Sequence, residues 1–492
     1  MTKLKERKSK PISTTSLLIL GLITLFGAFL RLYHLGYKPL WLDEAVIYLI
    51  SNQNLKYVIL KNSLRNSAPP LYVLLIHFIL KIGDSEELLR SVSLIGGVAS
   101  IPAMFFLSRQ FIHKIPAYIL CFIVAVAPTQ VKYSQELREY SLTFLFSILI
   151  LLFFYKTIKD PSWKNTAIMS LTMILGVFLQ YGLSVLIISL NIVFLIELIR
   201  NSKNRRIRLL RWISSQVFVL LSAISVIQIS LSGQAHFFEN TRDTSYYLFS
   251  TYWNGDIGTL LTFTKNNTLD LFSFAFPGWI FFLTTIFGFG YLIHMKSDYH
   301  EAPLMIIIPL SLTYSLALLG FYPFHGGRQD IFLTPIIYLL FGVALNFFWN
   351  FDVIKRWIFL IIILIPTMWN SRLTWDYLNY SGDENIIPII ESLSKNVEED
   401  DIIYVYYSAK PAFTYYYQKN VGNIFYGKYN RTQIQEYFNE IDSALLSGET
   451  VWLVFTHCFA DECNLLPNYV AKTREVELII SDNNAYLYHA KP

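Results

Sequence analysis

Two adjacent carboxylates stand shortly after the first long apolar run of the chain, in the sequence W-L-D-E-A. Asp43 and Glu44 follow Trp41, and Tyr48 lies a few positions further on. A carboxylate held at the edge of an apolar segment could take the proton from a substrate hydroxyl, which is the task of a general base. The alternative is structural, because acidic residues also stabilise the first turn of a helix by complementing its dipole.

A second group of ionisable residues lies between two later apolar runs, in residues 128–141 (P-T-Q-V-K-Y-S-Q-E-L-R-E-Y-S). If this segment packs against the first loop, Glu136 and Arg138 could bind sugar hydroxyls and phosphate. Lys132 and Tyr133 stand beside them in the sequence and are further candidates for substrate binding. The alternative is a solvated hairpin without a chemical role.

A third group lies in the sequence F-Y-P-F-H-G-G-R-Q-D-I-F. Gly326 and Gly327 permit a close backbone approach. Arg328 follows them, and its planar guanidinium can donate two parallel hydrogen bonds to a phosphate; a membrane-surface anchor is the alternative. We interpret His325 as a hydrogen-bonding neighbour, with metal ligation as the alternative, so that a divalent metal cofactor stays an open question.

The elements that must position these side chains lie in a membrane. Of 492 residues, 54% are apolar and 15% are charged, and the mean hydropathy is +0.42. Soluble domains carry about 25% charged residues. The composition therefore excludes a disordered chain, a coiled coil and an ordinary soluble enzyme, and it predicts an α-helical polytopic membrane protein. The net charge of +5 resides in loops between apolar runs, so we expect no nucleic-acid partner.

A membrane-spanning helix needs roughly 20 mostly apolar residues. Eleven segments qualify: residues 13–32, 91–108, 115–131, 141–155, 166–182, 183–199, 212–232, 270–293, 303–321, 332–348 and 357–371. Residues 69–82 are apolar but short, and they begin with Pro-Pro, which favours an interfacial or re-entrant helix.

The distribution of Lys and Arg orients these spans. With the N-terminus in the cytoplasm, the cytoplasmic segments hold 19 basic residues in 58 positions and the outer segments hold 12 in 124. We expect an uncleaved multi-pass protein of the plasma (inner) membrane with a long first outer loop over residues 33–90. All three groups of chemical side chains then lie on the outer side.

The chain changes character after the eleventh span. Residues 1–372 form the predicted membrane module, and residues 373–492 form a small extracytoplasmic α/β domain. The predicted strands and helices of this domain cover residues 402–407, 450–455 and 475–480, and residues 384–394 and 431–446, respectively. Outside the cytoplasm, Cys458 and Cys463 could pair, whereas Cys121 lies in an apolar run and is interpreted as a packed residue.

Several motifs occur along the chain in a characteristic order. They are W-L-D-E-A (41–45), A-P-P-L-Y (68–72), L-L-R-S-V-S (88–93), Y-S-Q-E-L-R-E-Y-S-L (133–142), G-G-R (326–328) and D-I-I-Y-V-Y-Y-S-A-K-P-A-F-T-Y-Y-Y (401–417). The ordered set resembles the GT-C superfamily of polyprenyl-phosphate-sugar-dependent glycosyltransferases. It is most similar to the bacterial branch of protein O-mannosyltransferases and lipid A aminoarabinose transferase.

The resemblance implies an outer-face active site between the first long loop and the helix bundle, with Asp43 as the catalytic carboxylate and residues 69–82 as a juxtamembrane helix. The implied partners are a polyprenyl-phosphate sugar donor, an extracytoplasmic glycan, lipid or protein acceptor, and membrane lipid. Where family members carry a metal or phosphate ligand before Pro-Pro, this chain has Ser67 and Ala68, so metal dependence stays open. Direct attack assisted by one base implies inversion at the anomeric carbon.

Three other functions deserve comparison. A flippase or transporter for lipid-linked saccharides is the first, but the middles of the predicted spans contain no Asp, Glu, Lys or Arg, which disfavours a charged internal pathway. The second is a ligase or polymerase that uses a pyrophosphate-linked oligosaccharide. The third is a receptor with a ligand-binding C-terminal domain, and this function leaves the charges of the outer loops unexplained.

Overall fold

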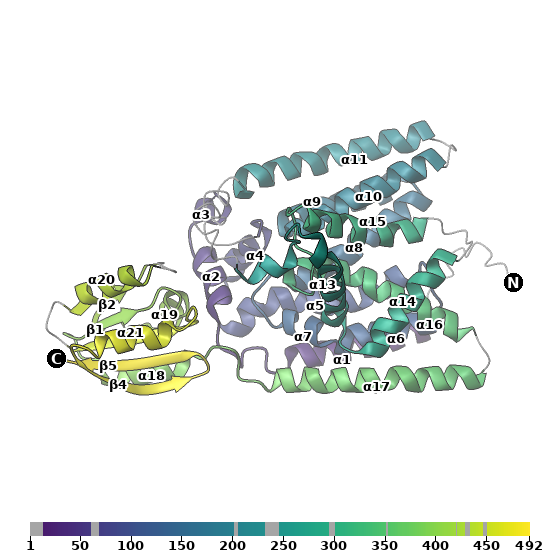
Figure 1. Cartoon of the computed structure of the whole chain (residues 1–492). Helices are drawn as coiled ribbons and strands as arrows, with labels where there is room; N and C mark the ends of the chain where they lie inside the picture. Colours follow the sequence, from purple (N-terminus) through teal and green to yellow (C-terminus); the bar gives the residue numbers. More distant parts are fainter. Residues whose placement is uncertain are drawn as a thin grey trace.

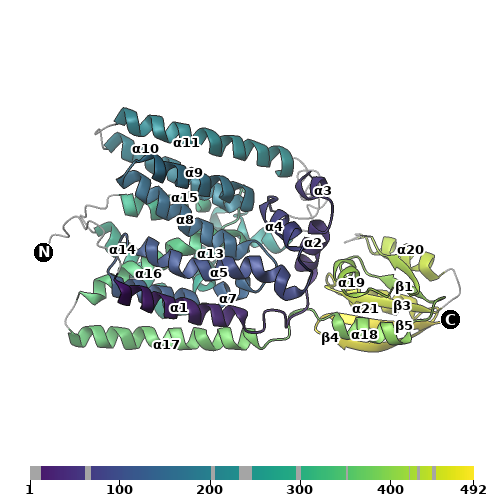
Figure 2. The ribbon, with the colours of Figure 1, turned by 180° about the vertical axis from the view of Figure 1, so that it is seen from behind.

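The computed structural model describes residues 13–60, 68–200, 205–231, 246–294, 301–350, 353–419, 421–428, 433–445 and 450–492. Long helices form a bundle, and a small α/β domain lies at one end of it (Figure 1). The first helix, α1, begins at the opposite end and runs toward that domain (Figure 2). We call the end of the bundle that carries the α/β domain the domain end.

Helices lie on each of the eleven predicted spans: α1 (Thr14–Leu32), α5 (Glu86–Ser108), α6 (Lys114–Val126) with α7 (Pro128–Ser134), α8 (Tyr140–Lys159), α9 (Trp163–Leu179), α10 (Tyr181–Arg200), α11 (Arg205–Val226), α13 (Leu260–Ala275) with α14 (Trp279–His294), α15 (Glu301–Leu318), α16 (Thr334–Trp349) and α17 (Val353–Leu378). Among the described residues, seven helices are long and apolar enough to cross a membrane, or up to nine if each of two bent pairs is one span. The helical membrane fold is confirmed, and the predicted number of eleven spans is approximate.

The first bent pair joins α6 and α7 at an angle of 56°. The break falls at Pro128, which has no amide hydrogen to continue the hydrogen-bond ladder. The carbonyl groups freed at the end of α6 are satisfied by the buried Arg31, which donates to Val124 and Ala125 at 3.1 and 2.8 Å and to Ser134 at 3.1 Å. These hydrogen bonds from Arg31 hold the bend and give polar partners to backbone groups in the apolar interior.

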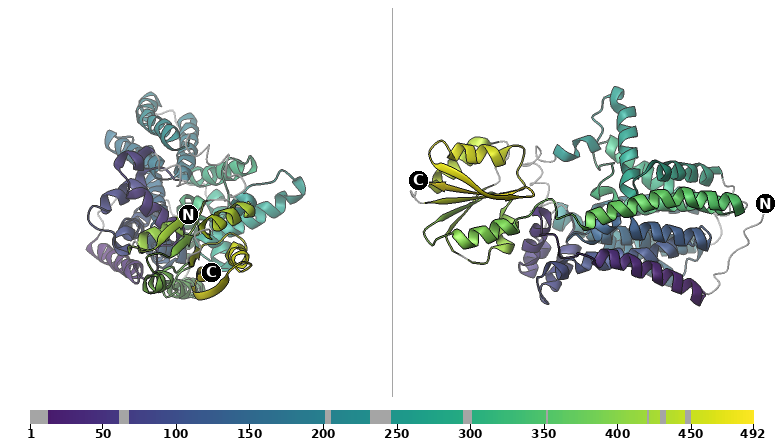
Figure 3. Two further views of the ribbon diagram at one scale, coloured as in Figure 1. Left: turned by 90° about the vertical axis from the view of Figure 1, so that its left-hand side faces the viewer. Right: turned by 90° about the horizontal axis from the view of Figure 1, so that it is seen from below.

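The second bent pair corrects one predicted span. Residues 270–293 were expected to form a single helix, but α13 and α14 meet at 106°. Pro277 interrupts the ladder, and Gly278 has a φ of 133°, which a side chain would strain. Figure 3 shows α13 lying across the direction of the bundle, whereas α14 runs along it.

The loop between α1 and α5 contains three short helices, α2 (Leu42–Ser51), α3 (Leu55–Leu60) and α4 (Leu71–Ile79). The nine residues of α4 are too few to cross a membrane, as the apolar length of 69–82 predicts. Ser67 lies outside the described residues, and Ala68 is buried. The loop therefore forms a folded layer on the domain end, next to α5 and the start of α8.

The α/β domain contains a five-stranded sheet in the order β2-β1-β3-β5-β4. Its elements are α18 (Ile387–Asn396), β1 (Ile402–Val405), α19 (Lys410–Tyr416), β2 (Asn423–Tyr426), α20 (Ile434–Leu445), β3 (Val451–Thr456), α21 (Glu462–Val470), β4 (Glu475–Asp482) and β5 (Ala485–Lys491). Strand β1 pairs in parallel with β2 and β3, whereas β5 pairs antiparallel with β3 and β4. Figure 3 shows helices on both faces of this sheet, and Cys458 and Cys463 form a disulfide.

Candidate active site

Asp43 and Glu44 lie in the first turn of α2, where both carboxylates complement the helix dipole. Adjacent residues on a helix point about 100° apart, so the two side chains face different surroundings. The side chain of Asp43 retains 26% of its accessible surface, whereas that of Glu44 retains 1%. Only the first can reach a substrate without rearrangement of the loop.

The three groups of candidate residues converge on Asp43. Arg328 from the G-G-R segment donates to Asp43 Oδ2 from Nη1 at 2.6 Å, and Arg138 Nη1 lies 3.4 Å from the same oxygen. The side chain of Arg328 is 28% exposed and that of Arg138 is 7% exposed. One carboxylate and two guanidinium groups, drawn from segments up to 285 positions apart, therefore form a single charged site.

Opposing effects act on the pKa of Asp43. Burial raises this pKa, but the positive charges of Arg138 and Arg328 outweigh burial, so that the pKa lies below its ordinary value. The carboxylate is therefore ionised at neutral pH. A ligand that drew one arginine away would raise the pKa again and make Asp43 a stronger base.

Glu44 serves the scaffold around this site. Its carboxylate accepts two hydrogen bonds from Arg90 of α5, at 2.9 and 2.7 Å, and the Leu137 N–H donates to it at 2.5 Å. The same Arg90 donates to the carbonyl groups of Leu35 and Lys38 at 2.9 and 2.8 Å. One buried ion pair thus ties α2, α5, the preceding loop and the segment that carries Arg138.

Residues 128–141 are not the solvated hairpin that we considered. Residues 128–134 form α7, and Glu136 and Arg138 are buried. Arg138 Nε lies 3.4 Å from Glu139 Oε2, and the backbone carbonyl of Arg138 accepts a hydrogen bond from Ser93 Oγ of α5 at 2.8 Å. This segment is a wall of the site because the ends of α5 and α8 pack directly around it.

Lys132, Glu136 and Tyr133 occupy different parts of that wall. Lys132 Nζ lies 3.7 Å from Glu136 Oε1, and its side chain is 43% exposed. Burial raises the pKa of Glu136 to about 7, although Lys132 opposes that shift. Tyr133 is buried against the rings of Tyr140 and Phe274, which makes it a packing residue behind the arginines.

The G-G-R segment is held by hydrogen bonds to its backbone. The His325 N–H donates to Asp330 Oδ2 at 2.9 Å, and its ring nitrogen Nε2 lies 3.3 Å from Gln329 Oε1. The Gly326 N–H donates to Asp270 Oδ2 of α13 at 3.1 Å. Burial lowers the pKa of His325, so the hydrogen-bonding role predicted for this residue suits its surroundings.

The described residues show no cluster of the side chains that most often bind metals. They contain no group of three or more His, Cys, Asp or Glu side chains that could hold an ion, and both arginines beside Asp43 would repel a cation.

Residues of the C-terminal domain reach the same site, and sequence reasoning missed them. The Leu42 N–H at the start of α2 donates to Glu384 Oε2 at 3.3 Å, and Glu384 also bonds to His457. The ring of His457 lies 6.4 Å from that of Trp41. No local pattern links positions more than 300 residues apart, and a lone glutamate or histidine in an α/β domain carries no signal for such a contact.

A tyrosine forms a second bridge from this domain. Tyr416 OH accepts a hydrogen bond from the Leu40 N–H at 2.8 Å and donates to Glu86 Oε1 at 2.7 Å. The neighbouring Tyr415 donates to the Asp84 carbonyl at 2.6 Å, and its ring contacts that of Tyr48. The loop that precedes Asp43 is therefore fixed from both sides, by the bundle and by the C-terminal domain.

Comparisons with known proteins agree with this architecture. Residues 67–229 match the family described as dolichyl-phosphate-mannose-protein mannosyltransferase, and no curated protein matches the sequence. The structure is similar to crystal structures of ArnT from Cupriavidus metallidurans, with 10% identity and 97% of this chain and 98% of that chain covered. The TM-score is 0.61 for the apo state and 0.57 for the complex with undecaprenyl phosphate.

A second solved structure, the oligosaccharyltransferase of Archaeoglobus fulgidus tethered with an acceptor peptide, has a TM-score of 0.53 and 12% identity, with 96% of this chain and 74% of that chain covered. The chain therefore has the fold of the GT-C glycosyltransferases. The resemblance indicated by the ordered motifs is confirmed at this level, and residues 67–229 add a sequence match to a mannosyltransferase family.

Proposed function

We propose that the protein transfers a sugar from a polyprenyl-phosphate donor to an acceptor on the outer face of the membrane. The observation that carries this proposal is the Asp43 carboxylate between Arg328 and Arg138, partly exposed at the domain end of the bundle. A phosphate that leaves a sugar needs positive charge, and an acceptor hydroxyl needs a base. Both requirements meet at one carboxylate oxygen.

The two arginines give the reaction an order. When the donor phosphate enters, it competes with Asp43 for the guanidinium of Arg328, because arginine binds phosphate through two parallel hydrogen bonds. Asp43 then loses part of its compensating charge, so its pKa rises. Donor binding thereby converts a carboxylate held in an ion pair into a general base.

The transfer step balances as a single displacement. The acceptor oxygen attacks the anomeric carbon and forms a new C–O bond, while its proton passes to Asp43. The bond between the anomeric carbon and the phosphate oxygen breaks, and the electron pair stays on the phosphate, which the arginines stabilise. Attack opposite the leaving group inverts the anomeric centre.

The similarity to ArnT bound to undecaprenyl phosphate supports a polyprenyl-phosphate donor, and the match to a dolichyl-phosphate-mannose family supports a lipid-linked monosaccharide. The proposal places the protein in the plasma membrane with its site facing outward, and the distribution of basic residues supports this orientation.

The proposal is tested in a deletion strain complemented with wild-type protein, Asp43→Asn or the matched control Asp376→Asn, an exposed carboxylate on α17. Lipid-linked sugars and the sugars of the cell envelope are measured in each. We expect Asp43→Asn to accumulate the donor lipid and to lose transfer by about 10²–10⁴-fold, with normal amounts of protein in the membrane. Normal transfer by Asp43→Asn would refute the role of this residue, and an unchanged lipid and envelope profile in the deletion strain would refute the proposed activity.

A further inference from the structure

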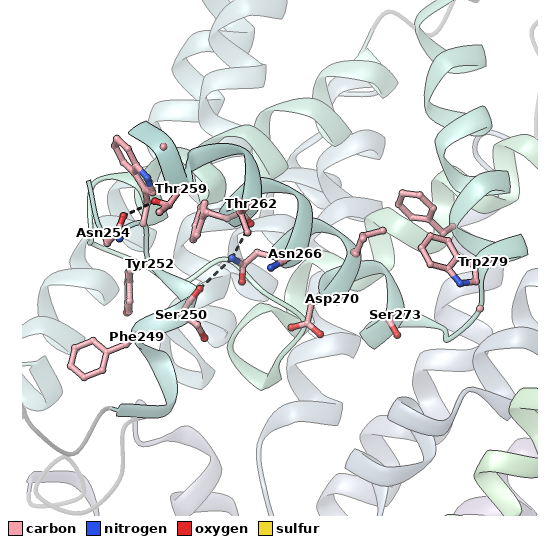
Figure 4. A pocket seen from close by; sticks show the side chains of 17 residues that line it. Phe249, Ser250, Tyr252, Asn254, Thr259, Thr262, Asn266, Asp270, Ser273 and Trp279 are labelled. Carbon is pink, nitrogen blue, oxygen red and sulfur yellow. Dashed lines mark hydrogen bonds between the residues drawn. The ribbon is translucent and has the colours of Figure 1, made fainter. Parts of the chain in front are cut away.

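A cavity of about 880 Å³ lies along α13, away from the described contacts of Asp43. It extends from the 3₁₀ helix η4 (Tyr246–Thr251) along α13 to the first turn of α14 (Figure 4). The volume lies within the usual range for small-molecule sites, roughly 300–1,000 Å³. The proposed mechanism makes no use of this groove, which we call the α13 groove.

One row of polar side chains lines the α13 groove along the helix. Thr262, Asn266, Asp270 and Ser273 recur at intervals of four, four and three residues, which places them on one face of α13. Figure 4 shows these four side chains along the length of the cavity. The row offers hydroxyl, amide and carboxylate groups, and it can therefore both donate and accept hydrogen bonds.

Aromatic rings stand at both ends of this row. Phe249 and Tyr252 lie at one end, and Trp279 lies at the other (Figure 4). Trp279 is 69% exposed although α14 belongs to the bundle. The negative face of an aromatic ring attracts the positively polarised C–H groups of a sugar ring that lies flat on it.

The α13 groove is joined directly to the segment that carries Arg328. Asp270 accepts the hydrogen bond from the Gly326 N–H at 3.1 Å. A Cβ at Gly326 would lie 2.1 Å from the Asp270 carbonyl oxygen, so only glycine permits this approach of the two backbones. A ligand seated in the groove therefore lies against the support of the phosphate-binding arginine.

We propose that the α13 groove binds the acceptor and that the acceptor is a saccharide. This inference rests on the proposed function, and it adds the class of molecule that receives the sugar. Aromatic rings at the ends of a row of amide, hydroxyl and carboxylate groups suit a chain of sugar rings. An isoprenoid tail would instead cover four polar side chains without giving them partners, which is unfavourable.

The test uses purified wild-type protein, Asn266→Ala and Trp279→Ala in lipid nanodiscs. The lipid extract of the deletion strain supplies the donor, and its lipid-extracted envelope supplies the acceptor. We expect each variant to need about tenfold more envelope for half-maximal transfer, with no change in the amount of lipid extract needed. The control Asn379→Ala, an exposed asparagine directly after the end of α17, should match the wild type in both measurements.

The acceptor class is read from treated envelope. Periodate, which cleaves sugar diols, should abolish acceptor activity, and protease should leave it intact. An unchanged requirement for envelope in both groove variants, an increased requirement for lipid extract, or an acceptor destroyed by protease alone would overturn the inference. The wild-type protein and Asp43→Asn are assayed in parallel. No transfer by the wild-type protein would refute the proposed function, and full activity of Asp43→Asn would refute the role of Asp43. Transfer by the wild type together with normal groove variants would refute only the acceptor groove.

Discussion

Asp43 and Glu44 are neighbours with opposite surroundings. The helical rotation between them turns Asp43 toward Arg328 and the partly open site, and it turns Glu44 into the interior toward Arg90. The sequence W-L-D-E-A cannot distinguish the two carboxylates, because each suits the first turn of a helix. The partner supplied by α5 distinguishes them.

This difference predicts a stability effect at Glu44. Glu44→Gln leaves Arg90 as a buried charge without its counter-ion, and breaking a buried pair in this way costs about 3–5 kcal/mol. We expect a clearly lower melting temperature in nanodiscs, with a smaller loss of turnover per folded molecule than in Asp43→Asn. The double variant Glu44→Gln with Arg90→Met should recover part of the stability, because no unpaired charge remains. If Glu44→Gln abolished transfer without any change in melting temperature, Glu44 would be the catalytic carboxylate.

Arg328 carries a second prediction at this scale, and it concerns pH. Arg328→Ala removes a cation that lowers the pKa of Asp43, so this pKa rises. Because the base works only when ionised, the acidic limb of the profile of kcat/KM against pH should move to higher pH. The variant should also lose about 2–4 kcal/mol of transition-state stabilisation, and turnover should fall accordingly.

Arg328→Lys is the matched variant for this measurement. It keeps the charge and loses the two-pronged hydrogen bonding, so the acidic limb should stay near its wild-type position while turnover drops less than in the alanine variant. A membrane anchor would give a different result. Near-normal turnover and an unshifted acidic limb in Arg328→Ala would indicate that Arg328 is a membrane-surface anchor.

Among the elements, the spans were more predictable than the connections. A long apolar run specifies a helix by itself, and helices lie on all eleven predicted runs. The bend between α13 and α14 escaped prediction because Pro277 and Gly278 sit inside a run whose mean hydropathy stays high. In the C-terminal domain, β2 and β5 were missed because strands of four and seven residues depend on their neighbours in the sheet.

The packing of α2 between the bundle and the C-terminal domain predicts a loss of activity from a distant change. Tyr416→Phe removes the oxygen that binds the Leu40 N–H and Glu86, and an amide left unpaired in a buried place costs about 1–3 kcal/mol. We expect faster hydrogen exchange in residues 40–44 and slower transfer. The half-saturating amount of donor should change little.

Tyr469→Phe is the control for this prediction, because Tyr469 OH donates to Asp442 at 2.8 Å on an exposed surface. It should leave both measurements at their wild-type values. Unchanged hydrogen exchange over α2 in Tyr416→Phe would show that the C-terminal domain does not fix the loop that carries Asp43. The residues of this domain that touch α2 could not be inferred from the sequence, because only the folded chain brings them together.

The orientation of the whole molecule in the membrane is predicted from the distribution of basic residues and from the elements that lie at the two ends of the bundle. The α/β domain lies at the end opposite to the start of α1 (Figures 1 and 2), as an odd number of crossings requires. The cluster of basic residues at 200–211 begins at the last residue of α10 and continues into the first turns of α11. If basic loops face the cytoplasm, then Asp43, Arg138, Arg328 and the α13 groove all face outward, where a lipid-linked sugar and an envelope acceptor can meet.

Reporter fusions test this orientation. A fluorescent protein that matures only in the cytoplasm should be dark when fused after Pro492, whereas an alkaline phosphatase that is active only outside should be active there. The same two reporters fused after Arg200, at the end of α10, should give the reverse pattern and show that each is produced. Whether the number of crossings is odd depends on how often each bent pair crosses the membrane. The fusions after Pro492 measure directly on which side the C-terminus lies, and hence whether that number is odd or even. Fluorescence after Pro492 would place the site of Asp43 on the cytoplasmic face, and a donor that presents its sugar on the outer face could not reach it.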